Sequence, residues 1–384
     1  MASTKTVVDV IEILKNKGAK KLSIQIAPAV RVSIGEYLGF PPGVNLVGEL
    51  VTALKQIGFD YVFDTNFGAD LTIMEEASEL VDRIKNNKLL PMFTTCCPSW
   101  YMFVERLYPE LIPHLSTVKS PQAILASIVK TKFREDMRIE KGELVHMVLA
   151  PCQMKKEEAK RKELWIYDDE PNIDVVLTTT EMADLLKQWP IDLHNLAKSE
   201  FDNPLGIASG AGAIFGTTGG VMEAAIRTAY YLMTGKDLDN FELTNVRNTG
   251  LKREGSIDIA GYMLNICTVN SLAEMKPILE EIKNTGTYHC QFIEVMNCPL
   301  GCIGGTGQWC TDREILLKRR EAIFAYDKEH RVRASYQNPY IQELYNNYFG
   351  KANGELAHQL MHIKYQDRSQ EPGENFACEI KDNQ

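Results

Sequence analysis

The strongest constraint on how this chain can fold comes from residues 294–308, which read EVMNCPLGCIGGTGQ. This stretch holds Cys298 and Cys302 in a loop with four glycines, directly after a β-like run at 288–295. Two thiolates in a loop with few side chains suit a soft metal centre that the backbone approaches closely. Because two cysteines are only half of a four-ligand site, cysteines from other segments must reach this loop.

The cysteine usage of the whole chain indicates a reducing environment. The chain has nine cysteines in 384 residues, which is an odd number in a protein too large to need disulfides. Its first residues have the pattern of an amphipathic helix rather than of a signal or transit peptide. We therefore expect thiols that are free or bound to metal, and a cytoplasmic localisation.

Charge and hydropathy argue against two classes of partner. A net charge of −9 is not that of a general nucleic-acid-binding protein. The longest uncharged run, residues 203–222, is rich in glycine, serine and threonine and is far less apolar than a membrane span. We expect neither nucleic acid nor a membrane as a partner.

Strand-like runs alternate along the chain with segments of helical periodicity, which predicts an α/β fold. We expect two lobes, each built on a twisted mixed or parallel sheet flanked by helices, with a metal cluster in the cleft between them. The expected boundaries are 1–150 for the first lobe, 151–309 for the second, 310–365 for a helical tail and 366–384 for a disordered end. A helix after Asp70 is expected to use that residue as its N-cap.

Two further predicted strands end in cysteine, one at Cys97 and one at Cys152. In open α/β sheets ligands gather at the carboxyl ends of strands, so these ends and the glycine-rich loop are expected at one cleft. Consecutive residues of an extended chain point to opposite sides, so Cys96 and Cys97 should not bind the same centre. Four thiolates suit zinc or an iron–sulfur cluster, and the absence of paired C-x2-C knuckles favours a cluster. The candidate ligands are Cys97, Cys152, Cys298 and Cys302.

The remaining cysteines are interpreted as ordinary buried thiols, because free cysteine is among the most buried residue types. They are Cys267, Cys290, Cys310 and Cys378.

Three motifs resemble the signatures of the iron-only (FeFe) hydrogenases. They are TTCCPSW at 94–100, PCQMKKEE at 151–158 and the stretch at 294–308. Further similarity runs through segments at 26–31, 63–76, 119–122 and 214–227, and the resemblance covers roughly residues 20–365.

The resemblance implies an H-cluster, in which a 4Fe–4S cubane is joined through one cysteine to a di-iron centre with carbon monoxide, cyanide and azadithiolate ligands. It implies that the four candidate ligands hold the cubane, with Cys302 as the bridge, and that Cys96 is the free thiol that passes protons. It also implies a proton relay through Glu76, Ser116 and Glu79. The two glutamates are three residues apart and share a helix face, which without the motif would be interpreted as a solvated face.

The resemblance further implies a set of residues around the cluster. Lys155 matches the lysine that donates to a cyanide ligand, as an ammonium beside an anion should. The other residues expected to line the cofactor pocket are Gln122, Glu158, Ala27, Pro28, Phe215 and Met296.

Five positions depart from the family pattern at or near the motifs and are expected to tune the cluster rather than to hold it. They are Ala150, Asn297, Leu300, Thr306 and Trp309. No ferredoxin-like module with extra clusters is evident, so we expect electrons to come directly from a ferredoxin or a similar carrier. The basic run at 155–162 is a candidate docking patch, although a solvated helix explains it equally well.

The expected activity is reversible reduction of two protons to hydrogen, and the expected partners include the proteins that build and insert the di-iron centre. Two alternatives share the fold. A hydrogen sensor usually carries signalling modules and an altered relay. A non-catalytic iron–sulfur assembly factor lacks the free thiol and carries an N-terminal cysteine cluster.

Overall fold

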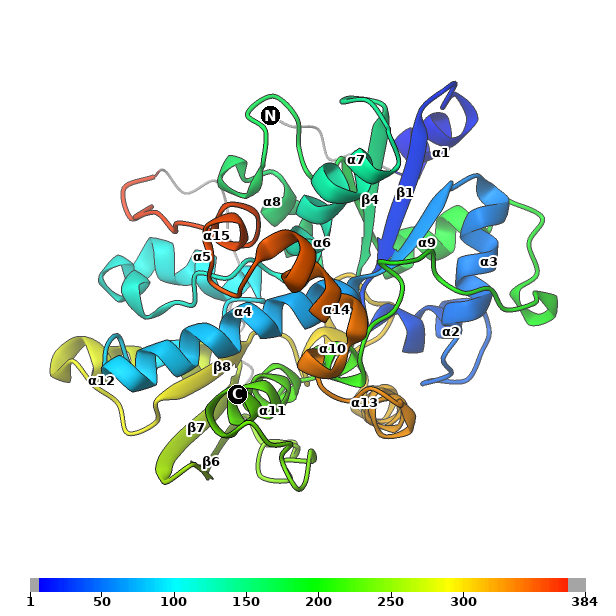
Figure 1. The fold of residues 1–384 in the computed structure, drawn as a ribbon. Helices are drawn as coiled ribbons and strands as arrows, with labels where there is room; N and C mark the ends of the chain where they lie inside the picture. The colour runs from blue at the N-terminus through cyan, green and yellow to red at the C-terminus, as the bar shows by residue number, and fades with distance from the viewer. Residues whose placement is uncertain (1–6, 372–384) are drawn as a thin grey trace.

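The computed structural model describes residues 7–371 and contains two sheets that lie on either side of a long helix, α4 (Thr65–Asn86) (Figure 1). The first sheet has the strand order β2-β1-β4-β5 and is parallel throughout. The second has the order β3-β8-β7-β6 and is parallel except for the β6–β7 pair. The strands are β1 (Lys21–Ile26), β2 (Tyr61–Asp64), β3 (Met92–Phe93), β4 (Leu144–Ala150), β5 (Val175–Thr178), β6 (Lys252–Ile259), β7 (Tyr262–Asn270) and β8 (Phe292–Met296).

Helices flank both sheets, with α3 and α9 packed on the first and α11 and α12 on the second (Figure 1). The predicted α/β class is therefore confirmed. Besides α4, the helices are α1 (Val7–Lys15), α2 (Ile34–Tyr37), α3 (Val47–Ile57), α5 (Pro98–Leu107), α6 (Pro121–Ile128), α7 (Arg134–Asp136), α8 (Met154–Ala159), α9 (Thr179–Leu186), α10 (Gly210–Ile214), α11 (Gly220–Thr234), α12 (Leu272–Thr285), α13 (Arg313–Glu329), α14 (Pro339–Leu344) and α15 (Glu355–Met361).

The expected lobe boundary between residues 150 and 151 does not separate the two sheets. β3 precedes this boundary but belongs to the second sheet, and β5 follows it but extends the first. The chain therefore crosses between the sheets more than once. Strand pairing depends on which backbone edges meet in space, and hydrophobic patterning does not carry that information.

The tail contains α13, α14 and α15, and its short helices lie across α4 in Figure 1. Of the segment expected to be disordered, residues 372–384 lie outside the described part of the chain.

Helix α4 begins earlier than the sequence pattern indicated. Asp64 caps it by accepting a backbone N–H at 3.0 Å, whereas Asp70, the expected cap, is buried inside the helix. The Asp70 carboxylate accepts from the hydroxyls of Ser209 and Ser335 and from the amide of Asn338. Buried carboxylates need such donors, so Asp70 ties the tail to the core instead of starting the helix.

Capping residues set the ends of two other helices. Thr178 and Glu181 form a capping box at the start of α9, and Gly235 ends α11 in the left-handed region with φ of 69°. The strand predicted to reach Cys97 is shorter than expected: it ends at Phe93 and continues as a loop into α5.

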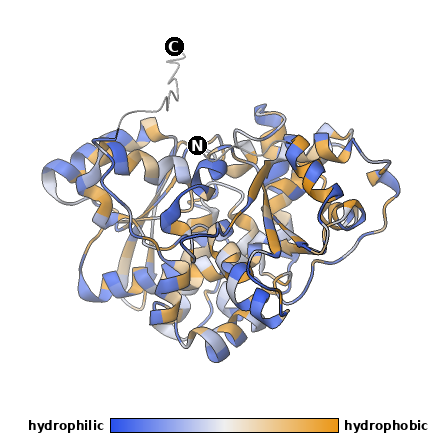
Figure 2. Ribbon diagram, turned by 90° about the horizontal axis from the view of Figure 1, so that it is seen from above, coloured by the Kyte–Doolittle hydropathy of each residue, from blue (hydrophilic) through white to orange (hydrophobic). Residues whose placement is uncertain are grey.

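Apolar residues are concentrated in the strands and on the inner faces of the helices, and polar residues cover the outer surfaces (Figure 2). Within residues 7–371, no helix is long and apolar enough to cross a membrane.

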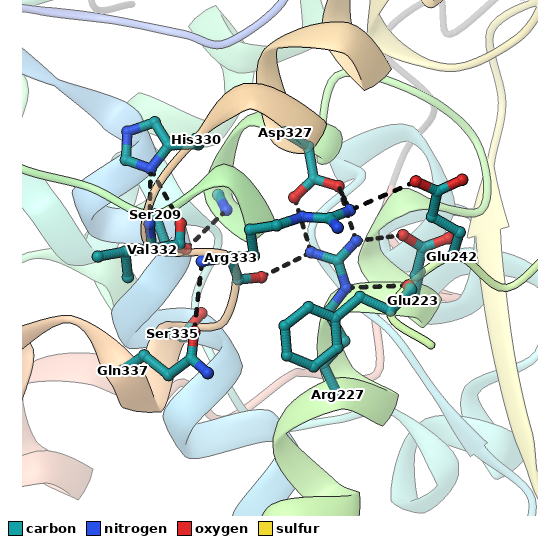
Figure 3. A network of polar contacts seen from close by, with 12 residues as sticks. Ser209, Glu223, Arg227, Glu242, Asp327, His330, Val332, Arg333, Ser335 and Gln337 are labelled. Carbon is teal, nitrogen blue, oxygen red and sulfur yellow. Dashed lines mark hydrogen bonds and ion pairs between the residues drawn. The ribbon is translucent and has the colours of Figure 1, made fainter. Parts of the chain in front are cut away.

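A buried network of charged side chains joins α11 to α13 (Figure 3). Arg227 donates to both oxygens of Asp327 at 2.8 Å and to Glu223 at 2.5 Å. Arg333 also donates to Asp327 at 2.8 Å, and Arg247 donates to Glu223 at 2.6 and 2.7 Å. Because the carboxylates and guanidiniums alternate, each buried charge is offset by a neighbour of opposite sign.

We expect the replacement Asp327→Ala to lower the free energy of unfolding by about 3–5 kcal/mol, because it leaves buried guanidiniums without their shared carboxylate. Urea denaturation of the variant measures the loss. The matched control is Glu242→Ala, which removes a carboxylate at the exposed end of the same network and should cost about 1 kcal/mol or less. Equal losses in the two variants would contradict a central role for Asp327.

Candidate metal-cluster site

The carboxyl ends of parallel strands bring the cysteine-bearing loops together. Cys152 follows β4 in the first sheet, whereas Cys97 follows β3 and Cys298 follows β8 in the second. Two hydrogen bonds join the loops of the two sheets: Gly307 N donates to the Pro151 carbonyl at 2.9 Å, and Gln153 N donates to the Thr306 hydroxyl at 3.1 Å. Segments more than 150 residues apart in the chain therefore share one site, as the strand-end argument requires.

The four candidate thiols lie within electrostatic range of one another. Burial is the main cause that raises the pKa of Cys302 to about 12 and the pKa of Cys298 well above its usual value, with Cys152 and Cys97 as the next causes in both. Each of these buried thiols makes ionisation of the others less favourable. A cation shared among them therefore stabilises their thiolate forms.

The spacing of these thiols argues against a single zinc ion. Thiolates around tetrahedral zinc would lie about 3.8 Å apart. Among the described residues, the one group of three or more potential ligand atoms within 4.8 Å of one another is Glu254, His289 and Cys290, and none of the four candidates belongs to it. No three of the four candidate thiols lie within 4.8 Å of one another, which fits a larger centre such as an iron–sulfur cluster.

Two glycines of the loop allow it to close on its neighbours. A Cβ atom on Gly305 would lie 2.2 Å from the Pro151 carbonyl oxygen, and one on Gly301 would lie 2.6 Å from Thr218 N. Gly301 also has φ of +95°, which other residues rarely adopt. The loop therefore needs glycine at both positions to pack against the first sheet and against the turn before α11.

Asn270 is a site residue that the sequence interpretation missed. Its amide donates to the carbonyls of Met296 and Cys298 at 3.0 and 2.5 Å, and its side-chain oxygen accepts from Leu300 N at 2.9 Å. It thus holds the backbone on both sides of Cys298. Its place at the end of β7 is the one local hint, and a single asparagine there has no distinctive spacing in the sequence.

We expect Asn270→Ala to lower the iron content of the reconstituted protein several-fold while leaving it folded, because Cys298 loses the contacts that position it. Iron and sulfide analysis with circular dichroism measures both. Asn265→Ala, at a partly buried position of the same strand away from Cys298, is the control and should bind iron normally. Unchanged iron content in Asn270→Ala would rule out this positioning role.

Cys96 and Cys97 face different parts of the interior. Cys96 packs in the same apolar cluster as Cys302, Phe215 and Met296, whereas Cys97 packs in the cluster formed around α5 and β8. Burial raises the pKa of the Cys96 thiol well above its usual value. This packing agrees with the expectation that Cys96 and Cys97 do not bind the same centre.

The three expected relay residues lie close together around Ser116. Ser116 Oγ donates to Glu79 Oε2 at 2.9 Å and is also within hydrogen-bonding reach of Glu76. Glu76 is buried, and burial followed by repulsion from Glu79 raises its pKa to about 8. Arg83 pairs with Glu79 at 2.6 Å near the surface. The alternative of a solvated helix face is therefore wrong for both glutamates.

Lys155 lies beside the cysteines with one donor to spare. Its ammonium is buried and donates to Glu158 at 2.8 Å and to the Cys96 carbonyl at 3.1 Å, which uses two of its three N–H groups. Glu158 also accepts from Tyr101, Ser120 and Gln122. A carboxylate occupied by four protein donors orients Lys155 and Gln122 rather than facing a ligand itself.

The remaining expected pocket residues are buried at strand and helix ends. Ala27 and Pro28 follow β1 directly, and Ala27 N donates to the carbonyl of Leu149 at the end of β4. Phe215 lies between α10 and α11, and Met296 ends β8.

The positions that depart from the family pattern behave differently from one another. Leu300 is buried with φ of 55°, a conformation that favours glycine, and Thr306 makes the bond to Gln153 described above. Ala150 is buried at the end of β4, and Asn297 makes only a long contact of 3.4 Å with a backbone N–H. Trp309, by contrast, lies at the surface with 55% of its area exposed.

The basic run at 155–162 does not form an open patch of positive charge. Lys156 pairs with Glu181, Lys160 with Glu157 and Arg161 with Glu105, and Lys155 is buried as described. A candidate docking surface for an electron carrier therefore cannot rest on this run.

Comparisons with known proteins agree with this geometry. The family model of the iron only hydrogenase large subunit, C-terminal domain, matches residues 20–306, and that of the iron hydrogenase small subunit matches residues 313–368. The NADP-reducing hydrogenase subunit HndD of Solidesulfovibrio fructosivorans is 42% identical over 365 residues, and iron hydrogenase 1 of Clostridium pasteurianum is 39% identical over 370. These matches cover 93% and 94% of this chain but 62% and 64% of the relatives, so the chain spans less than two thirds of their length.

A more distant relative and a solved structure complete the comparison. Cytosolic iron-sulfur assembly component 3 of Bos taurus is 28% identical over 363 residues, covering 90% of this chain and 74% of the relative. A variant of the apo [FeFe]-hydrogenase HydA1 from Chlamydomonas reinhardtii superimposes with a TM-score of 0.82 at 37% identity, covering 94% of this chain and 99% of that chain. The chain therefore belongs to the iron-only hydrogenase family.

Proposed function

We propose that this protein is an FeFe hydrogenase that reversibly reduces two protons to hydrogen at an H-cluster and exchanges electrons directly with ferredoxin. The observation that carries the proposal is the partly buried Cys96 thiol together with the buried Glu76 and Ser116 and the partly exposed Glu79. Ionisable groups with raised pKa values that lead from the surface into a cysteine-rich site serve proton transfer. A protein that only holds or hands on a cluster has no need for such a chain.

In this proposal Cys97, Cys152, Cys298 and Cys302 hold the 4Fe–4S cubane, and Cys302 also bridges to the di-iron centre. The cofactor supplies the redox chemistry that interconverts protons and hydrogen. The spare N–H of Lys155 is available to a cyanide ligand. Around it, apolar and small side chains keep water out of the pocket: Phe215, Met296, Ala27 and Pro28.

The relay residues move protons between solvent and the pocket. Glu79, near the surface and paired with Arg83, exchanges protons with solvent, and Ser116 links it to Glu76. Because the pKa of Glu76 is about 8, its carboxyl is mostly protonated at neutral pH and can donate toward Cys96. Cys96 then presents a proton inside the pocket.

The same residues argue against the assembly-factor alternative, since a complete relay has no role in cluster assembly. A cytoplasmic location, ferredoxin as the electron carrier and maturation proteins that insert the di-iron centre are parts of this proposal. The paired charges at 155–162 give no reason to place ferredoxin there.

Infrared spectroscopy tests the proposal after the chain has been loaded with iron and sulfide and then with a synthetic di-iron complex. We expect bands from bound carbon monoxide and cyanide, together with hydrogen evolution from reduced ferredoxin. Loaded protein with no such bands and no hydrogen would overturn the proposal. Bands without turnover would favour a sensing role.

A further inference from the structure

The C-terminal tail reaches the proton relay through Glu75, which directly precedes Glu76 on α4. Glu75 is fully buried and accepts hydrogen bonds from three tail residues: from the Tyr345 hydroxyl, from Asn353 N at 2.6 Å and from the ring of His362 at 3.0 Å. A buried carboxylate with three donors is well satisfied. Glu75 is thus, besides Asp70, a point at which the tail is attached to the helix that carries Glu76 and Glu79.

His362 joins this point to the segment that carries Ser116. Its Nε2 faces Glu75, and its Nδ1 lies 2.8 Å from the hydroxyl of Thr117. A carboxylate that already receives two other donors can only accept, so Nε2 carries a proton toward Glu75, and Nδ1 is left to pair with the Thr117 hydroxyl. α15, which ends at Met361 just before His362, packs against α6 and α4.

The backbone around Thr117 is paired with the tail as well. Ile363 N donates to the Thr117 carbonyl and Lys119 N to the Met361 carbonyl, each at 2.8 Å. Thr117 N in turn donates to Glu79 Oε2 at 3.1 Å, the same oxygen that accepts from Ser116. The position of the Glu79 carboxylate therefore depends on the segment around Thr117, which is itself held by hydrogen bonds to the tail.

We infer that His362 is a positioning residue of the proton relay: together with Glu75 it clamps Thr117, so that Ser116 Oγ and Thr117 N keep Glu79 in line with Glu76. The inference rests on the proposed function, because the relay matters only if protons travel along it. It gives the tail a part in proton transfer, although no tail residue belongs to the relay itself. The clamp acts through geometry, since neither His362 nor Thr117 passes a proton to Glu79 directly.

Amide hydrogen exchange of the metal-free protein tests the clamp without using activity. We expect Thr117→Val and His362→Ala to speed exchange in the peptide spanning residues 115–119 by about tenfold, the factor of one lost hydrogen bond. Thr117→Ser keeps the hydroxyl and should restore slow exchange. The matched control is Tyr345→Phe, which removes a different donor from Glu75 and leaves the link from His362 to Thr117 in place.

The loaded protein provides the second measurement. Thr117→Val should lower hydrogen evolution about tenfold and raise the solvent deuterium isotope effect, because a misaligned relay makes proton transfer rate-limiting. The infrared bands of Thr117→Val and its Michaelis constant for ferredoxin should stay near those of the original chain. The activity of Thr117→Ser should also stay near that of the original chain. If Thr117 had a purely structural role, Thr117→Val would instead lower the cluster content and leave the isotope effect unchanged.

The two proposals fail in different ways. If the original chain evolves hydrogen and Thr117→Val changes neither exchange nor the isotope effect, the clamp is overturned and the proposed function stands. If the loaded original chain shows no bands and no turnover, the proposed function is overturned, and a clamp seen by exchange would be a structural feature only.

Discussion

Replacement of Cys96 by alanine is expected to lower hydrogen turnover by about two to four orders of magnitude while the cluster remains bound. That range is the usual contribution of a group that transfers a proton in the rate-limiting step. Cys96 packs beside Cys302 but faces a different cluster from Cys97, so its loss should leave the four candidate ligands in place. Turnover assays and infrared spectra of the loaded Cys96→Ala variant measure the two effects separately.

Cys310→Ala is the matched control, because Cys310 is a partly exposed thiol beyond the glycine-rich loop, and this variant should keep full activity. Loss of the infrared bands in Cys96→Ala would show that Cys96 holds the cluster. Full turnover with the bands retained would show that protons reach the pocket by another route, and the relay assignment would be wrong.

The sequence was sufficient to predict the convergence of the cysteines because strand ends are local features with a global consequence. Cys97, Cys152 and Cys298 each follow an apolar run, and parallel strands align their carboxyl ends. The same reasoning separated Cys96 from Cys97 by the alternation of side chains along an extended segment. These predictions needed only the periodicity of a strand.

Predictions that depended on spatial partners were less successful. Asp70 has the sequence features of a helix cap, yet it is buried and bonded to Ser209, Ser335 and Asn338, which lie some 140 to 270 residues away. The two sheets do not follow the expected lobe boundary for a related reason, since β3 pairs with β8, about 200 residues further along the chain, whereas β5 extends the first sheet beside β4.

The basic run at 155–162 shows that partners from distant segments also decide whether a charged run forms an open patch. A count of five basic residues in that run suggests a patch, but Glu105 and Glu181 neutralise two of them from other segments.

Asn270 was missed for a related reason: a single asparagine in a strand has no distinctive spacing, and its role comes from three backbone groups of the Cys298 loop.

Glu76→Gln is expected to abolish most turnover and yet to stabilise the protein, more strongly as the pH rises. Glutamine has nearly the same shape and can still donate to Ser116, but it cannot release a proton, so turnover should fall by about two to four orders of magnitude. The stability effect follows from the pKa of Glu76, which burial and Glu79 raise from 4.5 to about 8.

The direction of the pH effect is set by which state binds the proton. Between pH 4.5 and about 8 the folded protein keeps the Glu76 proton while the unfolded chain has lost it, so the original protein loses stability as the pH rises through this window. A displacement of this size corresponds to roughly 4–5 kcal/mol, at about 1.4 kcal/mol per pH unit. Glutamine does not ionise, so the variant should lack this decrease.

Urea denaturation of the metal-free protein at pH 5 and pH 8 measures the difference. We expect Glu76→Gln and the original chain to have similar free energies of unfolding at pH 5, and the variant to be more stable by several kcal/mol at pH 8. Asp82→Asn, on the exposed side of α4, is the control and should show no comparable pH-dependent gain. If the variant and the original chain lose stability in parallel between the two pH values, Glu76 is ionised in the folded protein and cannot be the proton donor to Cys96.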